Sequence, residues 1–242
     1  MLRNSLSVCR HKITHQLLQL YSNLMPSPCL LCGVASSHWC LCNDCIKTLP
    51  TLDQICPRCA HPLNHNAICG QCLSQAPEQD DSFSLYHYLP PIDRLIADMK
   101  YYDKILLSKF FAQQMATQLK DRALPELLIP IPLHPRRLRQ RGYNQSWALA
   151  QYLSKLLIIP TRHDILVRTR DTVAQTSLPY SQRKQNIKRS FSVKSITIPS
   201  HIALIDDVLT TGHTANVAAK ALRKAGVQHI ELWTIARTMR HH

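Results

Sequence analysis

HIALIDDVLTTGHTANVAAKALRKAG, residues 201–226, is the most informative stretch of this chain of 242 residues. Its apolar start at residues 202–205 has the composition of a strand that is buried on both faces, as in a parallel sheet. Two acids and a Thr-rich loop follow, and from Val217 onward the apolar residues recur with a helical period. The stretch therefore predicts a strand, an acidic tip, a loop and a helix, which together indicate an α/β fold.

The acids Asp206 and Asp207 and the loop at 210–214 form a candidate ligand site. Parallel sheets bind ligands beyond the carboxyl ends of their strands. Loop N–H groups and a helix N-terminus favour phosphate, and Gly212 lets the backbone approach a ligand closely. Carboxylates beside a phosphate cradle suit a ribose 5-phosphate, which offers hydroxyls and can bring a metal ion. The alternative is an acid that merely caps the helix, but capping needs one acid and no such loop.

Residues 202–214 resemble the phosphoribosyl-pyrophosphate (PRPP) motif of type I phosphoribosyltransferases: four apolar residues, two acids, then a phosphate loop rich in Thr and Gly. The resemblance implies that Asp206 and Asp207 bind the ribose 2- and 3-hydroxyls, with Mg²⁺ accompanying PRPP. It also implies that the loop holds the 5-phosphate, through residues Thr210, Thr211, Gly212, His213 and Thr214.

Eight of the ten cysteines form four Cys-x-x-Cys pairs with gaps of 9, 10 and 9 residues between them. Two thiolates on a tight turn can both point at one tetrahedral ion, and two such turns complete a four-cysteine zinc site. We expect two zinc ribbons over residues 28–75, with two structural Zn²⁺ ions that supply most of the folding energy of so short a segment. The pairs are Cys29/Cys32, Cys42/Cys45, Cys56/Cys59 and Cys69/Cys72.

We expect the cysteine pairs to be grouped in tandem, first with second and third with fourth. The alternative is an interleaved grouping, first with third and second with fourth. Gly33 and Gly70 lie beside pairs, where knuckle turns favour a positive φ. Disulfides and an iron–sulfur cluster are the alternatives to zinc, although a cytosolic chain keeps its thiols reduced. Cys9 and Cys40 fall outside the pattern, and Cys40 is an alternative ligand because it lies two residues before Cys42.

The positive charge is concentrated in one segment. The chain has 29 basic and 15 acidic residues, a net charge of +14, and residues 134–194 alone hold 13 basic and 2 acidic residues, a net charge of +11. Such an excess indicates a polyanionic partner or a phosphorylated ligand, with a solubilising surface as the alternative. Aromatic residues among the cations suit single-stranded nucleic acid, whose bases can stack on them. They are Tyr143, Trp147, Tyr180 and Phe191.

A second anion site is expected after residues 127–133, a strand that Pro130 and Pro132 restrict to a sheet edge or a strand end. An arginine cluster and a helix follow this strand. In type I phosphoribosyltransferases the pyrophosphate loop follows such a strand, so the resemblance makes Arg136 and Arg137 candidates for the pyrophosphate. The other cations of the segment are candidates for nucleic acid: Arg139, Arg141, Arg183, Lys184, Lys188 and Arg189.

The remaining elements complete an α/β domain. We expect an edge strand at 82–89, helices starting near Ile92 and Leu106, and a last strand at 230–236. In the fold that the resemblance implies, the basic segment 167–191 takes the place of a loop that covers the ligand site, with a solvated loop and basic helix as the alternative. The predicted fold class is α/β, a type I phosphoribosyltransferase-like parallel sheet flanked by helices and preceded by a small four-cysteine double zinc-ribbon module. The predicted domains are 1–27, with a short amphipathic helix at 11–25, then 28–78 for the ribbons and 80–242 for the sheet domain.

The order of the motifs over residues 28–238 resembles the ComF family, which includes bacterial competence proteins and the related GntX proteins. The motifs are the cysteine knuckles, PIPLHPRRLRQRGYNQS at 130–146, RTRDTVAQTSL at 168–178, QRKQNIKRSF at 182–191 and LIDDVLTTGHT at 204–214. The resemblance implies handling of incoming single-stranded DNA during natural transformation, with competence DNA-translocation proteins as partners. The sequence has neither a signal peptide nor an apolar run of about 18 residues, so we expect a cytoplasmic protein, placed by that role at the inner face of the membrane.

Three function classes stay open from the sequence. The first, which the basic segment favours, is a competence factor that binds PRPP or a related ribose phosphate together with single-stranded DNA. The second is a phosphoribosyltransferase acting on a soluble nucleobase-like acceptor, although the sequence shows no base-recognition segment and no evident general acid or base. The third is a regulator that senses PRPP.

Overall fold

The computed structural model describes residues 27–36, 40–65, 67–101, 105–168, 190–194 and 197–239. The helix expected at 11–25, Cys9, Tyr180 and the basic residues of 169–189 lie outside these ranges. The chain divides into two compact units, Met1–Leu49 and Pro50–His242. The predicted domain boundaries at 27 and 78 stay predictions.

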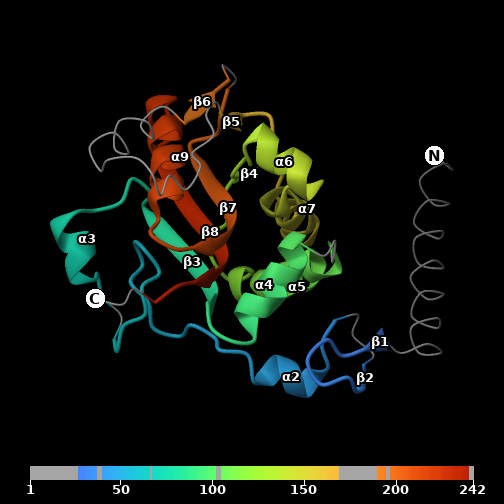
Figure 1. The fold of residues 1–242 in the computed structure, drawn as a ribbon. Coiled ribbons are helices and arrows are strands. Elements are labelled where there is room, and N and C mark those ends of the chain that lie inside the picture. Colours follow the sequence, from blue (N-terminus) through green and yellow to red (C-terminus); the bar gives the residue numbers. More distant parts are fainter. Residues whose placement is uncertain are drawn as a thin grey trace, which may run out of the picture. The chain divides into compact units, whose positions relative to one another are not determined.

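A four-stranded parallel sheet is the centre of the second unit (Figure 1). Its order is β3 (Asp81–His87), β8 (His229–Arg237), β7 (His201–Leu209) and β4 (Leu127–Pro130). Because all four strands run in the same direction, their carboxyl ends meet at one edge of the sheet. The parallel sheet with flanking helices confirms the fold class that the sequence predicts.

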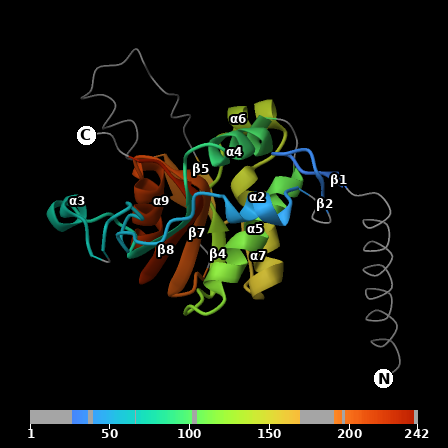
Figure 2. The same cartoon turned by 90° about the horizontal axis from the view of Figure 1, so that it is seen from below.

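Helices cover both faces of this sheet, which explains why its central strands are apolar almost throughout (Figure 2). On one face, alternate residues of the strands pack with the apolar side of α9 (His213–Lys224), including Ile202, Ile230 and Leu222. On the other face lies α7 (Gln145–Leu157), which contacts β4, β7 and α5 (Ile105–Leu119). Helix α4 (Ile92–Tyr101) packs against α5 and ends near the acidic tip of β7.

Three local predictions need correction. Strand β7 does not end before the acids but continues to Leu209, because β8 pairs with it that far, whereas β4 stops at Pro130. The arginine cluster is not a loop: it forms a short helix, α6 (Pro135–Arg141), which starts at a proline and is capped by His134. The ends of the expected loop 167–191 are strands, β5 (Leu166–Arg168) and β6 (Phe191–Val193), which pair antiparallel.

Short elements carry the cysteines. The first unit contains β1 (Ser27–Pro28), β2 (Ala35–Ser36) and α2 (Asn43–Lys47). The second four-cysteine segment includes α3 (Gly70–Ser74) and belongs to the same unit as the sheet. Among the residues that the structure describes, no helix has the length and apolar character needed to cross a membrane.

Candidate functional site

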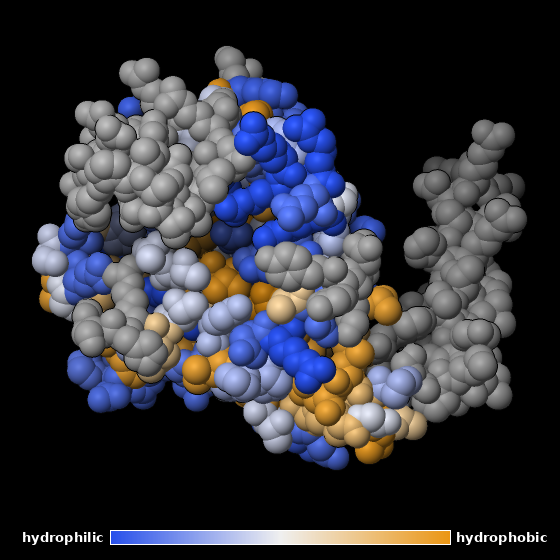
Figure 3. Space-filling view, viewed as in Figure 1, coloured by the Kyte–Doolittle hydropathy of each residue, from blue (hydrophilic) through white to orange (hydrophobic). Residues whose placement is uncertain are grey.

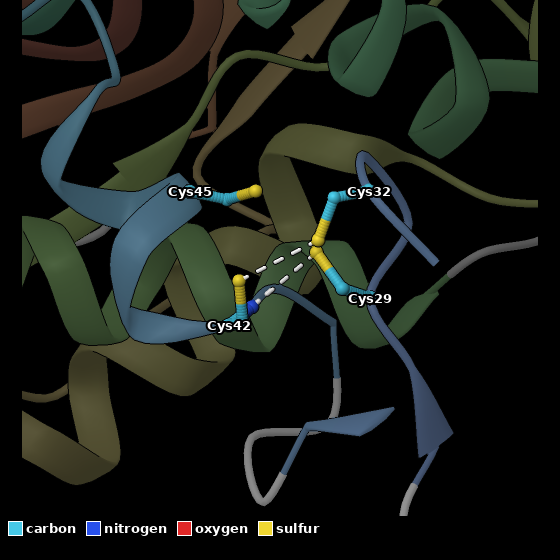
Figure 4. A group of neighbouring side chains, drawn as sticks. All are labelled: Cys29, Cys32, Cys42 and Cys45. Atoms are coloured by element: carbon cyan, nitrogen blue, oxygen red, sulfur yellow. Dashed lines mark hydrogen bonds between the residues drawn. The ribbon is translucent and has the colours of Figure 1, made fainter. Parts of the chain in front are cut away.

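The first four-cysteine site lies within the first unit and brings together Cys29, Cys32, Cys42 and Cys45 (Figure 4). One ligand atom from each cysteine lies within 4.8 Å of the others. The Sγ atoms of Cys32 and Cys42 are 3.7 Å apart, and the Cys42 N–H points at the Cys29 sulfur over 3.4 Å. This grouping is the tandem one, and it includes Cys42 and not Cys40.

The second four-cysteine site repeats this geometry with Cys56, Cys59, Cys69 and Cys72. The Sγ atoms of Cys59 and Cys69 are 3.6 Å apart, and the Cys69 N–H points at the Cys56 sulfur over 3.4 Å. In both sites the first pair lies on a knuckle turn, and the second pair begins a short helix whose N-cap is Cys42 or Cys69. The two sites are therefore built in the same way.

Each knuckle contains one residue with a positive φ, and the sequence predicts its position correctly in the first knuckle but not in the second. Gly33 has φ +75° and follows the first knuckle, as expected. Gly70 does not take a positive φ but begins α3, and the left-handed residue of the second knuckle is Ala60, at φ 52°. Gly33 closes the first knuckle by donating its N–H to the Cys29 carbonyl, and Ala60 closes the second by donating its N–H to the Cys56 carbonyl.

The sulfur positions fit zinc. A tetrahedral ion with Zn–S bonds of about 2.3 Å separates its sulfurs by about 3.8 Å, close to the 3.6 and 3.7 Å in the two sites. Burial acts to raise the pKa of the Cys29 thiol, but N–H donors of Cys32 and Cys42 lower it to about 6. Contact with the Cys42 and Cys32 thiols raises the pKa of Cys45, so the four thiols do not ionise together unaided. Zinc coordinates cysteine as thiolate and would resolve this conflict.

A third group of possible ligands, His201, His229 and Glu231, has a different geometry. His201 Nε2 and Glu231 Oε1 are 2.7 Å apart, the length of a hydrogen bond, whereas two ligands of one zinc ion would be separated by about 3.3 Å. The other Glu231 oxygen accepts from Trp233 Nε1 at 2.8 Å. At the amino ends of β7 and β8, His201 and Trp233 are therefore hydrogen bonded to Glu231, and the His229 ring contacts the His201 ring edge to face.

The two acids of β7 are held by side chains from two other elements. Asp206 Oδ1 accepts a hydrogen bond from the Ser146 hydroxyl at 3.0 Å and from the Asp207 N–H at 2.9 Å. Asp207 Oδ2 lies 3.0 Å from Lys100 Nζ at the end of α4. Burial and then the neighbouring Asp207 carboxylate raise the pKa of Asp206 to about 7, against the opposing effects of these donors and of Lys100. Asp206 can therefore carry a proton near neutral pH.

The loop after β7 leads directly into α9 through Gly212. Gly212 is the N-cap at φ 75°, a conformation that strains other residues. Gly212 has no side chain with which to cap the helix, and the His213 N–H donates to Thr211 Oγ1 at 3.4 Å. A helix N-terminus of this kind favours an anion. The acid Asp206 and this loop line one small hollow, with Thr210, Gly212, His213 and Thr214 among its residues. The structure thus brings together Asp206 and most of the predicted phosphate loop.

The turn between α6 and α7 and the first residue of α7 are hydrogen bonded to the end of α4 and to the segment after β4. The Tyr143 hydroxyl donates to the Met99 carbonyl, and Gln145 Nε2 donates to the Lys100 carbonyl at 3.4 Å. Asn144 caps α7 and also donates to the Ile131 carbonyl at 3.1 Å. These bonds fix the N-terminus of α7, from which Ser146 reaches Asp206.

The predicted basic residues that the structure describes lie on α6. Arg136 and Arg139 are exposed, and Arg137 and Arg141 are half-buried. Helix α6 follows the carboxyl end of β4, so it lies at the same edge of the sheet as the acids (Figure 1). In the space-filling view, hydrophilic surface gathers over α6 (Figure 3). The predicted cations Arg183, Lys184, Lys188 and Arg189 lie outside the described residues.

Two of the aromatic residues expected to stack on bases have other contacts. Phe191 is 9% exposed and belongs to the core, with the Arg168 guanidinium over its ring, so it is a wrong candidate for base stacking. The Trp147 ring packs against His163, with 4.5 Å between centroids. Sequence reasoning also missed Lys100, Ser146 and Arg237 as residues that contact the acids or the loop. Ser146 ends a quoted motif, but no local pattern marks Lys100 or Arg237.

Two sites built from four cysteines each, with a parallel sheet that ends in paired acids, define an α/β protein carrying a double zinc ribbon. Indeed, a family model described as "Double zinc ribbon domain" matches residues 20–73. Competence protein F of Haemophilus influenzae is 37% identical over 207 residues, which cover 81% of this chain and 90% of that protein. DNA utilization protein YhgH of Shigella flexneri is 32% identical over 227 residues, which cover 89% of this chain and 99% of that protein.

The chain therefore belongs to the ComF family, which its motifs predict and which these two relatives represent. Among solved structures, the glutamine PRPP amidotransferase from B. subtilis matches with a TM-score of 0.37 and 15% identity, over 52% of this chain and 26% of that one.

Proposed function

We propose that the carboxyl edge of the sheet binds PRPP or a related ribose phosphate. The observation that carries this proposal is the hollow in which a half-buried carboxylate, Asp206, adjoins an N-terminal helix turn that begins with Gly212. A helix N-terminus attracts phosphate, whereas a carboxylate repels it, so one ligand that suits both must offer phosphate and hydroxyl groups on the same molecule. A ribose 5-phosphate does so.

In this proposal the residues have separate tasks. Thr210, Thr211 and Thr214 donate hydroxyl hydrogen bonds to the 5-phosphate, together with the N–H groups of Gly212 and of His213, which exchanges its bond to Thr211 Oγ1 for one to the phosphate. Asp206 and Asp207 accept hydrogen bonds from the ribose 2- and 3-hydroxyls. Mg²⁺ accompanies PRPP because its pyrophosphate is highly charged. Arg136 and Arg137 on α6 are the candidates for neutralising that pyrophosphate, since α6 begins at the same edge of the sheet.

Calorimetry with PRPP and Mg²⁺ tests the proposal. Asp206→Asn with Asp207→Asn keeps the shape of both side chains and removes their charge. We expect PRPP affinity to fall about a hundredfold or more, because two charge-assisted acceptors are lost. Asp164→Asn is the matched control, since Asp164 is a half-exposed acid that pairs with Arg162. Equal PRPP affinity of the double variant and of the wild type would refute the proposed site.

We further propose that the protein binds single-stranded DNA through the basic segment 134–194 and acts on incoming DNA during natural transformation. The charge of that segment and the exposed arginines of α6 support this role. The relative from Haemophilus influenzae is named a competence protein, and the one from Shigella flexneri a DNA utilization protein. Competence DNA-translocation proteins are the partners that this role implies.

A second candidate function is a phosphoribosyltransferase with a soluble nucleobase-like acceptor. A cleft of about 420 Å³ beside the loop favours it, because this volume is large enough for such a molecule. Amide side chains line the cleft and could hydrogen bond a planar heterocycle: Gln71, Gln75, Gln79 and Asn216. Release of pyrophosphate from PRPP in the presence of a panel of nucleobases, and not in their absence, would favour the transferase over a competence factor or a PRPP-sensing regulator.

A further inference from the structure

The second cysteine knuckle is bonded to the sheet through three consecutive carbonyl groups. The Pro57 carbonyl accepts from the Ser82 N–H at 2.6 Å, and the Arg58 carbonyl accepts from the Ser82 hydroxyl at 2.8 Å. The Cys59 carbonyl accepts from Arg237 Nε at 3.0 Å. Ser82 lies in β3 and Arg237 ends β8, so hydrogen bonds attach this knuckle to two neighbouring strands of the sheet.

Arg237 continues this connection to the ligand loop. Arg237 is 1% exposed, and its Nη1 donates to the Leu209 carbonyl at 2.8 Å and to the Thr210 carbonyl. Thr210 is the first residue of the predicted phosphate loop. One buried side chain therefore bonds a zinc-ligand residue, Cys59, on one side and the start of the loop on the other.

We propose that Arg237 is a positioning residue that couples zinc binding at the second site to the conformation of the loop at 210–214. The second zinc ribbon is then a structural part of the ligand site. In the part concerning ligand affinity, this inference rests on the proposed binding of a ribose phosphate at that loop.

The physical reason lies in the geometry of arginine. A planar guanidinium directs several N–H groups in fixed directions, so it can satisfy carbonyls on two segments at once. The Cys59 carbonyl keeps its direction while the knuckle keeps its shape, and zinc bound by Cys56 and Cys59 would hold that shape together with the Ala60 N–H bond to the Cys56 carbonyl. If the zinc leaves, Arg237 loses one acceptor inside a buried site, and the Leu209 and Thr210 carbonyls are held less firmly.

The coupling can be measured without any ligand, by hydrogen exchange of the amides at 209–214 in the whole protein. Arg237→Lys keeps the charge, but a single ammonium group cannot reach all three carbonyls. We expect these amides to exchange about tenfold faster or more in this variant, while the zinc content stays that of the wild type. Arg223→Lys is the matched control, because Arg223 bonds the Glu78 carbonyl and Asp80 near the other end of α9.

Zinc removal from wild-type protein is the second measurement, and it remains informative should the Arg237 variant fail to fold. A chelator that empties the second site should raise exchange at 209–214 to the level of Arg237→Lys. Cys32→Ser, which disrupts the first site in the other unit, should leave those amides unchanged. Unchanged exchange at 209–214 after loss of the second zinc would overturn the coupling.

Ligand binding separates this inference from the proposed function. If PRPP binds the loop, coupling is reciprocal, so PRPP should slow zinc release from the second site and Arg237→Lys should bind PRPP about tenfold more weakly. Equal PRPP affinity of Arg237→Lys and wild type would overturn the coupling and leave the binding site standing. Faster exchange in Arg237→Lys, with no PRPP binding by wild type, would support the coupling and refute the proposed ligand.

Discussion

Lys100 and Asp207 form an ion pair, with 3.0 Å between Nζ and Oδ2 and side chains that are only 19% and 14% exposed. The pair joins the end of α4 to the acidic tip of β7, so one cation compensates a site with two adjacent carboxyls. Lys100→Met removes this cation. We expect the free energy of unfolding near neutral pH to fall by about 1–3 kcal/mol, because a largely buried carboxylate loses its partner.

Denaturant unfolding measures that loss, and Lys120→Met is the control because Lys120 is exposed. The variant should also raise the pKa of Asp206 further, since Lys100 acts to lower it. A loss of stability no larger in Lys100→Met than in Lys120→Met would show that the pair does not contribute.

The pH dependence of stability should report the half-buried acid Asp206. Its pKa in the folded protein, about 7, lies above its ordinary value of 3.8, so the folded state holds this proton more tightly than the unfolded chain does. This contribution to stability is full below the ordinary value and is lost as the pH rises through about 7. Asp206→Asn stays neutral, so we expect its melting temperature to match that of the wild type near about pH 4 and to exceed it near about pH 8.

Thermal unfolding followed across that pH range checks this expectation. Asp164→Asn is again a suitable comparison, because pairing with Arg162 lowers the pKa of Asp164 to about 2 and its effect has the opposite sign. A melting-temperature difference between Asp206→Asn and wild type that stays constant over the whole range would contradict the raised pKa.

The metal content should be two zinc ions per chain, because two closed groups of four cysteines are present in the described residues. Elemental analysis of two variants shows whether Cys42 or the neighbouring Cys40 is a zinc ligand. Cys42→Ser should lower the content to about one ion, since the first site needs four ligands. Cys40→Ser is the matched control and should keep both ions. If Cys40→Ser loses an ion and Cys42→Ser does not, the grouping of the first site is wrong.

Binding of single-stranded DNA should depend steeply on salt, because each phosphate contact releases counterions. Arg139→Ala with Arg141→Ala should weaken binding for every DNA sequence and reduce the slope of log affinity against log salt by about one unit or somewhat more. Arg94→Ala with Lys120→Ala removes the same charge from exposed positions outside 134–194, and it should change the slope less. Wild-type protein that shows no salt-dependent binding to a long single strand would end the DNA proposal.

Local patterns in the sequence were enough for much of this protein. Cysteine spacing predicts both metal sites because a Cys-x-x-Cys turn is a local structure whose two sulfurs converge wherever the turn forms. The acids and loop of 206–214 were recognised because strand, loop and helix follow one another without interruption. The buried strands β7 and β8 were found for the same reason: their apolar runs reflect burial on both faces.

Contacts between segments that are distant along the chain could not be predicted from the sequence and are known only from the tertiary structure. Lys100, Ser146 and Arg237 reach the acids or the loop from α4, α7 and the end of β8, and no sequence period records such a meeting. The tandem grouping of the cysteines and the attachment of the second knuckle to β3 likewise depend on packing. Spacing constrains neighbours along the chain, whereas Lys100, Ser146 and Arg237 reach the acids or the loop because parallel strands collect their carboxyl ends, and the segments that follow them, at one edge of a sheet.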